Sequence, residues 1–453
     1  MRRRQTWSAA IGCSALFLLV YGLTNARAAA ATDLDSWHFD WEESIPFVPW
    51  MIVPYVSIDL FFVAAPFVCT SRREVATLAK RLCAAILTAG LVFLIWPLQL
   101  GFDRPQAVGM FAPLYGALHG FDQPHNLFPS LHVTLIFILR WTYHRHVRGL
   151  TRGLLHVWFA LVTASTVLTR QHHLPDLLGG LVLALLVFYV FPTGLIRRRD
   201  VRVERAPSRR LALRFLAAAS VALLGAAIFL VTDLPGRWLP AAMLGWTALA
   251  FAIVAVGYGR LGPLVFRKYA GYLSLPARAV LAPYLLGLWL SRRRFWRRDP
   301  RPFAIIMDEV MFGRLPDRRL LAELKSLGVG AIVDLTAEHS AVPAARALDY
   351  TCVPMMDLAP PQPRDVRTAV GQVERALAAG LGVYLHCGLG YQRSAIVIAC
   401  WLLETERATT TRAAALRVAS ARPMGLSADH LARELDALTA SPSRGDRENV
   451  DSM

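Results

Sequence analysis

The sequence is poor in charged residues, and its acidic residues are outnumbered by its basic ones. Asp, Glu, Lys and Arg together make up 18% of the 453 residues, whereas hydrophobic residues make up 55%. This composition is too apolar for a series of soluble domains, and the chain is too long for one ordinary domain. We therefore expect an integral membrane protein that carries a soluble part.

The usual marks of nucleic-acid-binding proteins and of disulfide scaffolds are also missing. The net charge is +17, but the basic residues gather beside apolar runs, without interleaved aromatic platforms or finger spacing. Anionic membrane lipid is therefore the expected partner, and nucleic acid is not. The six cysteines give no framework, so no disulfide is predicted. Three lie in or at apolar runs and three in the C-terminal region: Cys13, Cys69 and Cys83, then Cys352, Cys387 and Cys400.

Eight apolar runs predict membrane-spanning helices. They cover residues 7–23, 45–68, 82–98, 127–143, 153–169, 177–196, 211–231 and 238–256. For the first run the alternative is a cleaved signal peptide, and we prefer a retained span. The second run contains Asp59 and several prolines, which lipid tolerates only when neighbouring helices cover them. That run is therefore expected to face the interior of a helical bundle.

Charge asymmetry predicts the orientation of these spans. Four basic segments fall on one side of an eight-span path, namely residues 1–4 and the expected loops 72–81, 140–152 and 197–210. The acidic segment 33–43 falls on the other side. Because cytoplasmic loops carry the excess of Lys and Arg, the chain should return to the cytoplasm at Gly257. A run at 279–290 is too short to cross and lies between arginines, which is typical of an interfacial helix.

A stretch at residues 382–395 predicts a reaction from its residue types and spacing. A strand-like approach ends at His386 and leads into Cys387. Five residues with two glycines follow, and then come Arg393 and a helix-forming run at 394–406. The free N–H groups of a helix N-terminus suit a phosphate dianion, and together with a guanidinium they stabilise a thiolate. Cys387 is therefore a candidate nucleophile.

The string His-Cys-x-x-Gly-x-x-Arg-Ser resembles the signature of cysteine-dependent phosphatases, and its setting resembles the dual-specificity branch. The resemblance extends over about residues 303–438 and implies a central sheet flanked by helices. It implies that Cys387 attacks phosphorus, that Arg393 clamps two oxygens, and that Ser394 helps the thiolate to leave. The expected phosphate-binding residues are those around the nucleophile: His386, Gly388, Leu389, Gly390, Tyr391 and Gln392. A merely buried cysteine would leave Arg393 and the glycines unexplained.

This family also uses an Asp that protonates the leaving oxygen, about thirty residues before the nucleophile. Asp357 has that spacing, after a strand-like run and before a Pro-rich loop, and we take it as the general acid. Asp349 and Asp365 are weaker candidates. A thiolate enzyme needs a reducing compartment, which agrees with the cytoplasmic side that the charge pattern predicts for this region.

The membrane half contains two motifs of its own. Pro129-Ser130-Leu131-His132 begins the fourth apolar run, and His172-x-x-x-Asp176 lies between the fifth and sixth. The pair resembles the second and third motifs of the type 2 phosphatidic acid phosphatase superfamily, above all its inositol phosphorylceramide and sphingomyelin synthase branch, over residues 45–196. The resemblance implies that His172 attacks phosphorus, Asp176 orients it, His132 protonates the leaving oxygen and Ser130 lies near the phosphate.

The membrane motifs depart from the family pattern. The Lys of the first motif would fall at Pro97 if Arg104-Pro105 ended that motif, and the Arg of the third motif is Thr166, for which Arg170 is a candidate replacement. Two readings therefore stay open. One is an active phosphatase or phosphotransferase on the outer face, and the other is a degenerate domain that serves as an anchor and lipid-binding surface.

The full reading is a membrane-bound phosphatase with six segments. They are a first span and acidic loop (1–44), a membrane core (45–200), two additional spans (201–258), a basic linker (259–300), a phosphatase domain (301–440) and a disordered tail (441–453). The chain resembles bacterial fusions of the two families, which implies the bacterial inner membrane. Neither mechanism calls for a metal or another cofactor.

The expected substrate is a phosphorylated lipid with one phosphomonoester, because the loop after Cys387 has no Lys or Arg to stabilise further phosphates. The basic residues 292–298 favour a substrate presented at an anionic membrane. The alternatives are a membrane-anchored phosphatase that acts on tyrosine- or serine-phosphorylated proteins, and an inactive scaffold.

Overall fold

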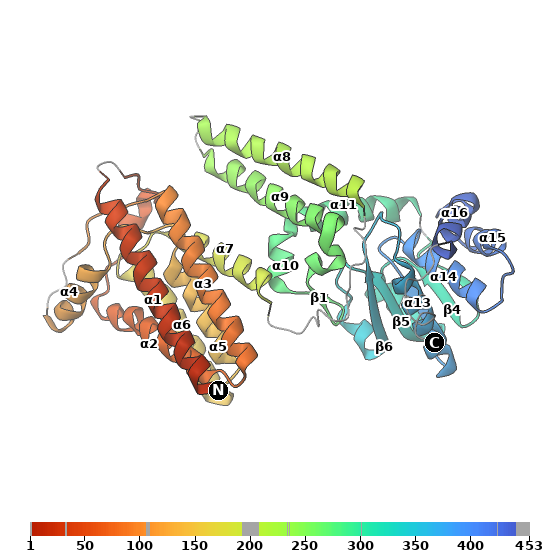
Figure 1. The fold of residues 1–453 in the computed structure, drawn as a ribbon, viewed down its shortest axis with the longest axis horizontal. Helices are drawn as coiled ribbons and strands as arrows, with labels where there is room; N and C mark the ends of the chain where they lie inside the picture. Colours follow the sequence, from red (N-terminus) through yellow and green to blue (C-terminus); the bar gives the residue numbers. More distant parts are fainter. Residues whose placement is uncertain are drawn as a thin grey trace, which may run out of the picture. The chain divides into compact units, whose positions relative to one another are not determined.

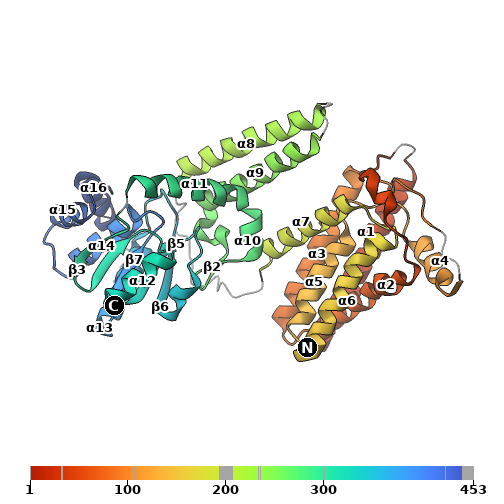
Figure 2. The ribbon, with the colours of Figure 1, turned by 180° about the vertical axis from the view of Figure 1, so that it is seen from behind.

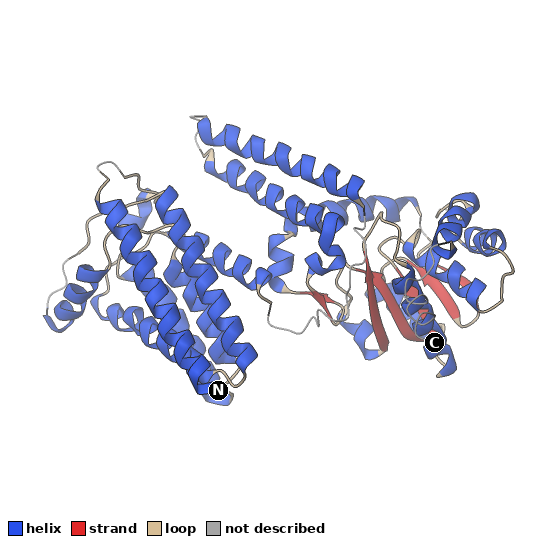
Figure 3. Ribbon diagram, in the orientation of Figure 1, coloured by secondary structure: helices blue, strands red, loops and turns tan. Residues whose placement is uncertain are grey.

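The computed structural model describes residues 2–31, 34–105, 109–192, 208–232, 234, 236–299, 301–423 and 425–440. The chain divides into two units, Met1–Gly194 and Leu195–Met453. In the described parts the first unit is a helical bundle, and the second combines helices with a central sheet (Figure 3). The expected disordered tail and most of the expected basic segment 197–210 lie outside the described residues.

The first unit is built from seven helices in its described part. They are α1 (Arg2–Ala29), α2 (Ile52–Val68), α3 (Arg72–Ile95), α4 (Ala112–Phe121), α5 (Leu131–His144), α6 (Gly149–Leu168) and α7 (Leu174–Val190). Helix α1 packs along α3, and α5 packs against α2, α3, α6 and α7. Leu82, Ile138 and Val162 are fully buried in the shared core. Helix α5 therefore lies in the middle of the bundle.

Two expected basic loops are wrong in their extent. Residues 72–81 form the first turns of α3, because the side chain of Ser71 accepts a hydrogen bond from the N–H of Glu74 and caps the helix. Arg81 is buried and donates to the carbonyl of Phe191 at 2.9 and 2.6 Å. The second loop shortens to residues 145–148 because α5 and α6 extend into it.

Six helices in the described residues are long and apolar enough to cross a membrane. They are Arg3–Ala29, Pro49–Val68, Arg72–Ile95, Gly149–Leu168, Arg209–Val231 and Trp238–Phe266. The fourth and sixth expected spans coincide with α5 and α7, which have 14 and 17 residues. At 1.5 Å per residue these helices rise about 21 and 26 Å, less than the ~30 Å hydrocarbon core of a typical bilayer. Length and composition thus support about six spans rather than the expected eight.

The second unit begins with a helical hairpin, α8 (Arg209–Val231) and α9 (Trp238–Val256), whose two helices run side by side (Figure 1, Figure 2). After short helical turns and the strands β1 (Lys268–Tyr269) and β2 (Tyr272–Leu273) come α10 (Leu275–Val280) and α11 (Ala282–Arg298). Helix α11 extends eight residues beyond the interfacial helix expected to end at Leu290. Val254 and Tyr258 pack with Ala337, Met356 and Ala359, so one end of the hairpin is joined to the sheet region.

A five-stranded sheet forms the centre of the second unit. Its strands are β3 (Phe303–Met307), β4 (Val310–Gly313), β5 (Val329–Thr336), β6 (Asp349–Met355) and β7 (Gly382–His386), in the order β3-β4-β7-β5-β6. Strand β3 is antiparallel to β4, and the other pairs are parallel. The expected strand at 382–386 is confirmed as β7, in the middle of the sheet. Its buried position explains its apolar sequence.

Helices cover both faces of this sheet. Helix α12 (Arg318–Ser326) packs on one face, where Leu320 and Leu324 meet Tyr384. The other face carries α13 (Pro363–Ala378), α14 (Arg393–Glu404), α15 (Thr411–Ala421) and α16 (Ala428–Thr439), packed around the fully buried Trp401. The expected central sheet flanked by helices is confirmed. The loop between the end of β7 at His386 and the start of α14 at Arg393 lies at the carboxyl edge of the sheet.

Candidate active site

The loop from Cys387 to Gln392 folds closely around the sulfur of Cys387. The N–H of Gly390 donates to Cys387 Sγ at 3.2 Å, and Ser394 Oγ lies 3.5 Å from the same atom. Gly390 has φ +77°, and a Cβ on it would lie 2.3 Å from the carbonyl carbon of Gly313. Only glycine fits this left-handed position against β4. The loop thus directs a backbone donor and a hydroxyl at a buried thiol.

Arg393 is held beside this loop by a carboxylate that sequence reasoning missed. Its two terminal nitrogens lie 3.0 and 2.7 Å from the carboxylate oxygens of Glu338, a bidentate pair, and Nη1 also donates to the carbonyl of Met355 at 2.9 Å. Burial opposes ionisation of Glu338, but Arg393 lowers the pKa of Glu338 to about 2. Glu338 is therefore ionised near pH 7, and its carboxylate fixes the plane of the Arg393 guanidinium through two hydrogen bonds.

Glu338 follows β5, the parallel neighbour of β7. The carboxyl ends of parallel strands meet at one edge of a sheet, so an acidic residue just after the apolar stretch of β5 was a signal that could have found it.

Asp357 lies against the same arginine, in the turn after β6. Its Oδ1 is 3.0 Å from Arg393 Nη2, and its side chain is 31% exposed. Burial raises the pKa of Asp357, Arg393 lowers it, and Glu338 raises it again, with a net increase. The backbone carbonyl of Asp357 accepts a hydrogen bond from the hydroxyl of Tyr258 at 2.8 Å. Asp357 is thus an accessible carboxyl group that retains its proton to a higher pH than usual.

The weaker acid candidates lie elsewhere. Asp349 begins β6 and pairs with Arg375 at 3.5 Å on the surface, and Asp365 lies in the first turn of α13. Asp357 is the candidate that the structure brings to Arg393.

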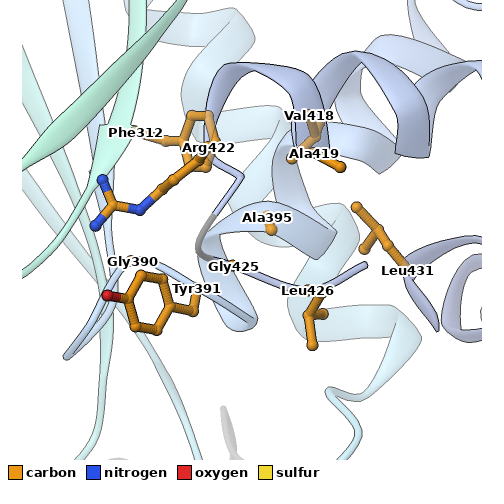
Figure 4. Close-up of a pocket in the computed structure, with 10 residues that line it drawn as sticks. All are labelled: Phe312, Gly390, Tyr391, Ala395, Val418, Ala419, Arg422, Gly425, Leu426 and Leu431. Atoms are coloured by element: carbon orange, nitrogen blue, oxygen red, sulfur yellow. The ribbon is translucent and has the colours of Figure 1, made fainter. Parts of the chain in front are cut away.

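A second set of contacts supports the loop from behind (Figure 4). Arg422 lies 3.3 Å from Asp299 Oδ2, and it donates to the carbonyl of Leu389 at 3.2 Å. The hydroxyl of Tyr391 donates to Asp299 at 3.2 Å, and the ring of Tyr391 lies under the Arg422 guanidinium. Figure 4 shows Arg422 and Tyr391 at one end of a small pocket whose other end is apolar. This pocket lies behind the loop, and it contains neither Cys387 nor Arg393.

The other loop residues expected to bind phosphate differ in position. His386 is buried beneath the loop, 4.0 Å from Asp334, and burial lowers its pKa. Asp334 also pairs with Lys268 at 2.7 Å. The carbonyl of Gly388 accepts from the N–H of Leu315 at 3.4 Å, and Gln392 is the residue that precedes α14. His386 therefore supports the loop from below with its side chain.

The two motifs of the membrane half adjoin in the first unit. The N–H of Ser130 donates to the carbonyl of Asp176 at 3.0 Å, and Thr134 Oγ1 donates to the carbonyl of Gly180 at 2.9 Å. A Cβ on Gly180 would lie 2.4 Å from the carbonyl oxygen of Ser130. Gly180 thus permits the N-terminal ends of α5 and α7 to meet, as the motif pairing predicts.

The chemical groups of these motifs lie in a buried polar cluster. His172 Nδ1 is 3.5 Å from Asp176 Oδ2, which accepts a hydrogen bond from the N–H of His173 at 2.8 Å. The ring of His132 stacks on Tyr55 with centroids 4.2 Å apart. Among the described residues, His132 Nε2, His172 Nδ1 and Asp176 Oδ1 are buried atoms without a hydrogen-bond partner. His172 Nδ1 faces Asp176, as an oriented imidazole would, and His132 Nε2 is the buried nitrogen that is able to contact a bound phosphate or its leaving group.

Two neighbouring residues have structural contacts. Arg170 donates to the carbonyls of Glu43 and Ile45 at 2.7 and 3.0 Å. His173 lies 3.6 Å from Glu42 and accepts a hydrogen bond from the N–H of Gly101 at 3.0 Å. The acidic segment 33–43 therefore contacts the third motif, which the sequence alone did not indicate.

Comparisons with known proteins match two separate regions of the chain, one for each candidate site. Residues 310–439 match the model of the dual specificity phosphatase catalytic domain, and residues 78–200 match that of the PAP2 superfamily.

Two curated relatives match part of the chain. The phosphatidylglycerophosphate phosphatase PTPMT2 of Arabidopsis thaliana is 31% identical over 139 residues, which are 29% of this chain and 58% of that protein. A protein of Invertebrate iridescent virus 3, named provisionally as tyrosine phosphatase 067L, is 34% identical over 112 residues, 22% of this chain and 45% of that one. The chain thus spans about half the length of these relatives.

Among solved structures, Tk-PTP in its active form is similar with 24% identity and a TM-score of 0.27, covering 30% of this chain and 95% of that one. The family matches therefore identify two domains in this chain: a PAP2 superfamily domain at residues 78–200, followed by a dual-specificity phosphatase catalytic domain at residues 310–439.

Proposed function

We propose that the second unit hydrolyses phosphomonoesters through a phospho-cysteine intermediate. The sulfur of Cys387 attacks phosphorus as the bond to the leaving oxygen breaks, and Asp357 gives its proton to that oxygen. Water then attacks the phospho-cysteine, and the hydroxyl of Ser394 stabilises the departing thiolate. The observation that carries the proposal is the position of Arg393, held by Glu338 and placed 3.0 Å from Asp357 at the edge of the loop.

The proposed substrate is a lipid phosphomonoester on the cytoplasmic side of the membrane, such as phosphatidylglycerophosphate or a phosphorylated phosphoinositol-type lipid. Three observations support it. The name of the Arabidopsis thaliana relative contains that first lipid. The loop residues between Cys387 and Arg393 are uncharged. The hairpin of α8 and α9, two candidate spans, packs beside the Asp357 turn.

The experiment is a hydrolysis panel with purified full-length protein. Vesicles that contain phosphatidylglycerophosphate or a phosphoinositide monophosphate are compared with tyrosine- and serine-phosphorylated peptides, with Cys387→Ser as the control. Release of phosphate from the lipids that depends on Cys387 supports the proposal. Turnover of the peptides alone would favour the signalling phosphatase, the alternative that the viral relative's name suggests.

The proposed topology has eight spans, with α5 and α7 as short crossings in the bundle interior. The N-terminus and residues after Gly257 then lie in the cytoplasm, and the ends of α5 and α7 that carry His132 and His172 face the opposite side of a bacterial inner membrane. A reporter enzyme fused after Ser291 tests this topology. Activity that requires export of the reporter would show that the number of spans is odd.

A second proposed function belongs to the first unit, a His-dependent lipid phosphatase or phosphotransferase on the outer face. The observation that favours it is the meeting of the two motifs through the bond from Ser130 to Asp176, with His172 beside Asp176. In this proposal His172 is the nucleophile and His132 the acid. Transfer of labelled lipid phosphate in Cys387→Ser protein, abolished by His172→Ala, supports activity, and its absence supports a degenerate domain.

A further inference from the structure

Two arginines from outside the catalytic loop lie over the ring of one tryptophan. The guanidinium of Arg292, on α11, is 4.9 Å from the ring centroid of Trp296, and that of Arg314, just after β4, is 4.1 Å from the same centroid. Trp296 therefore holds two like charges close together. We call these three side chains the cationic rim.

A chain of polar contacts connects the cationic rim to Arg393. Arg292 Nη1 donates to His339 Nδ1 at 3.3 Å, and His339 Nε2 lies 3.6 Å from Glu338, the partner of Arg393. Burial and Arg292 lower the pKa of His339 to about 4 although Glu338 opposes them, so the ring is neutral near pH 7 and accepts the bond from Arg292. Arg292 is thus linked to Arg393 through His339 and Glu338.

Gly388 lies between the phosphate-binding loop and the residues that contact the cationic rim. A Cβ on Gly388 would lie 3.2 Å from His339 Nε2 and 3.6 Å from Arg393 Nη2. On the other side, the carbonyl of Gly388 accepts from the N–H of Leu315, the residue after Arg314. Gly388, the second residue of the phosphate-binding loop, is thus adjacent to His339, the partner of Arg292, and is bonded to the residue that follows Arg314.

The charge of the cationic rim is poorly balanced. Arg314 has one carboxylate neighbour in the described chain, Asp317, at 3.8 Å, and that side chain is 49% exposed, so the pair is weak. For Arg292 no carboxylate lies at ion-pair distance among the described residues, and Arg314 together with burial lowers the pKa of Arg292 while Glu338 raises it. Trp296 Nε1 and Arg314 Nε are buried without a hydrogen-bond partner in the same set of residues. A bound anion would relieve the repulsion between the arginines and could accept these hydrogen bonds.

We infer that Arg292 and Arg314 bind a second anionic group of the substrate, the phosphodiester that lies next to the phosphomonoester in a phospholipid headgroup. This inference rests on the proposed lipid phosphatase activity and narrows its substrate class. The loop itself is uncharged and takes one phosphomonoester. The phosphodiester carries a single negative charge, which two arginines on a partly exposed surface suffice to stabilise.

The experiment compares two water-soluble substrates that differ only in the phosphodiester arm. They are the deacylated headgroup of phosphatidylglycerophosphate and glycerol 3-phosphate, offered to full-length protein in detergent. We expect wild-type kcat/KM to favour the headgroup by about 30-fold or more, and Arg292→Gln and Arg314→Gln each to lower that ratio about tenfold. The matched control is Arg293→Gln on the same helix, whose guanidinium lies over Trp289, and it should leave the ratio unchanged.

Several outcomes would overturn the inference. A wild-type ratio near one would do so while leaving the proposed phosphatase activity in place. Equal losses on both substrates in Arg292→Gln and Arg314→Gln would show that the arginines only support Arg393 through His339 and Glu338. An arginine effect seen with vesicles but not with the soluble headgroup would assign the cationic rim to membrane attachment. Failure of the protein to hydrolyse either substrate or vesicle lipid, with peptides turned over, would refute the proposed function itself.

Discussion

The two candidate sites differ in where their polar groups come from. Around Cys387, a single loop and the helix after it supply the donors, and the buried Arg393 already has Glu338 and Asp357 as partners. In the first unit, His132 and His172 come from different parts of the bundle; His172 Nδ1 faces Asp176 at 3.5 Å, and His132 Nε2 is buried without a hydrogen-bond partner in the described residues. The nucleophile, the backbone donors and the arginine of the second unit thus come from one segment that Glu338 and Asp357 complete, whereas the groups of the first unit come together only through the packing of several helices.

The largest expected effect tests whether the loop site acts alone. Cys387→Ser or Arg393→Ala should reduce hydrolysis of a soluble phosphomonoester by at least about 10³-fold, because the nucleophile or the phosphate clamp is lost. The measurement is phosphate release by full-length protein. Cys400→Ser, a buried cysteine on α14 away from the loop, is the control and should retain activity. Full activity in Cys387→Ser would contradict the assignment.

A matching pair of variants tests the bundle site. His172→Ala and Asp176→Asn should each remove any lipid phosphate turnover that persists in Cys387→Ser, by about 10³-fold for the nucleophile. Neither should change hydrolysis of a soluble substrate by the second unit. Thr163→Ala on α6 serves as a nearby polar control. If Cys387→Ser alone abolishes all turnover, the site in the first unit is degenerate and only the Cys387 site is active.

The next expected effect concerns the proton that Asp357 supplies. Asp357→Asn should lower kcat by about 10²-fold for a substrate with a poor leaving group. The wild-type rate should fall as pH rises through the raised pKa of Asp357, because only the protonated carboxyl group can donate. The variant should lose this alkaline limb in a pH–rate profile. An unchanged limb in Asp357→Asn would assign the proton to another group.

Glu338→Gln tests the fixed position of Arg393. We expect kcat/KM to fall about tenfold, because a neutral amide holds the guanidinium less firmly. The pKa of Glu338 is lowered to about 2 in the folded protein. Its stabilising contribution is therefore present above the unfolded value of ~4.3 and is lost as pH falls toward 2. Unfolding curves should show a steeper loss of stability in this window for wild type than for the variant.

The smallest expected effect concerns Tyr258, at the end of the hairpin. Tyr258→Phe removes the hydrogen bond to the carbonyl of Asp357 and should lower kcat about two- to tenfold, the equivalent of ~0.5–1.5 kcal/mol. The pH of the alkaline limb should shift with it, since the bond positions the Asp357 turn. A loss confined to thermal stability, with an unchanged pH–rate profile, would show that Tyr258 only joins the hairpin to the sheet.

The sequence was sufficient where the signal is local. The spacing of Cys387, Arg393 and Asp357 predicted residues that the fold brings together, and hydropathy located helices at all eight expected spans. It was insufficient where partners lie far apart in the chain. Glu338 is 55 residues from Arg393, and its place just after a strand indicates that the two meet only once β5 is known to pair with β7. Helix ends were misplaced at Arg72, because a capping side chain outweighed the appearance of a charged loop.

Residues before the family match contact the catalytic domain, and these contacts decide where a separately expressed catalytic fragment should begin. The family match starts at residue 310, but Asp299 supports Tyr391 and Arg422, and Lys268 pairs with the buried Asp334. A fragment cut at residue 303 would remove Lys268 from the buried Asp334, which would then keep only its hydrogen bonds from Thr336 and Tyr350 and its contact with His386, and it would also remove Asp299 from Arg422. An autonomous enzyme should therefore start before Lys268, and a start near Ser208 would also keep the hairpin residues Val254 and Tyr258, which pack on the Asp357 turn.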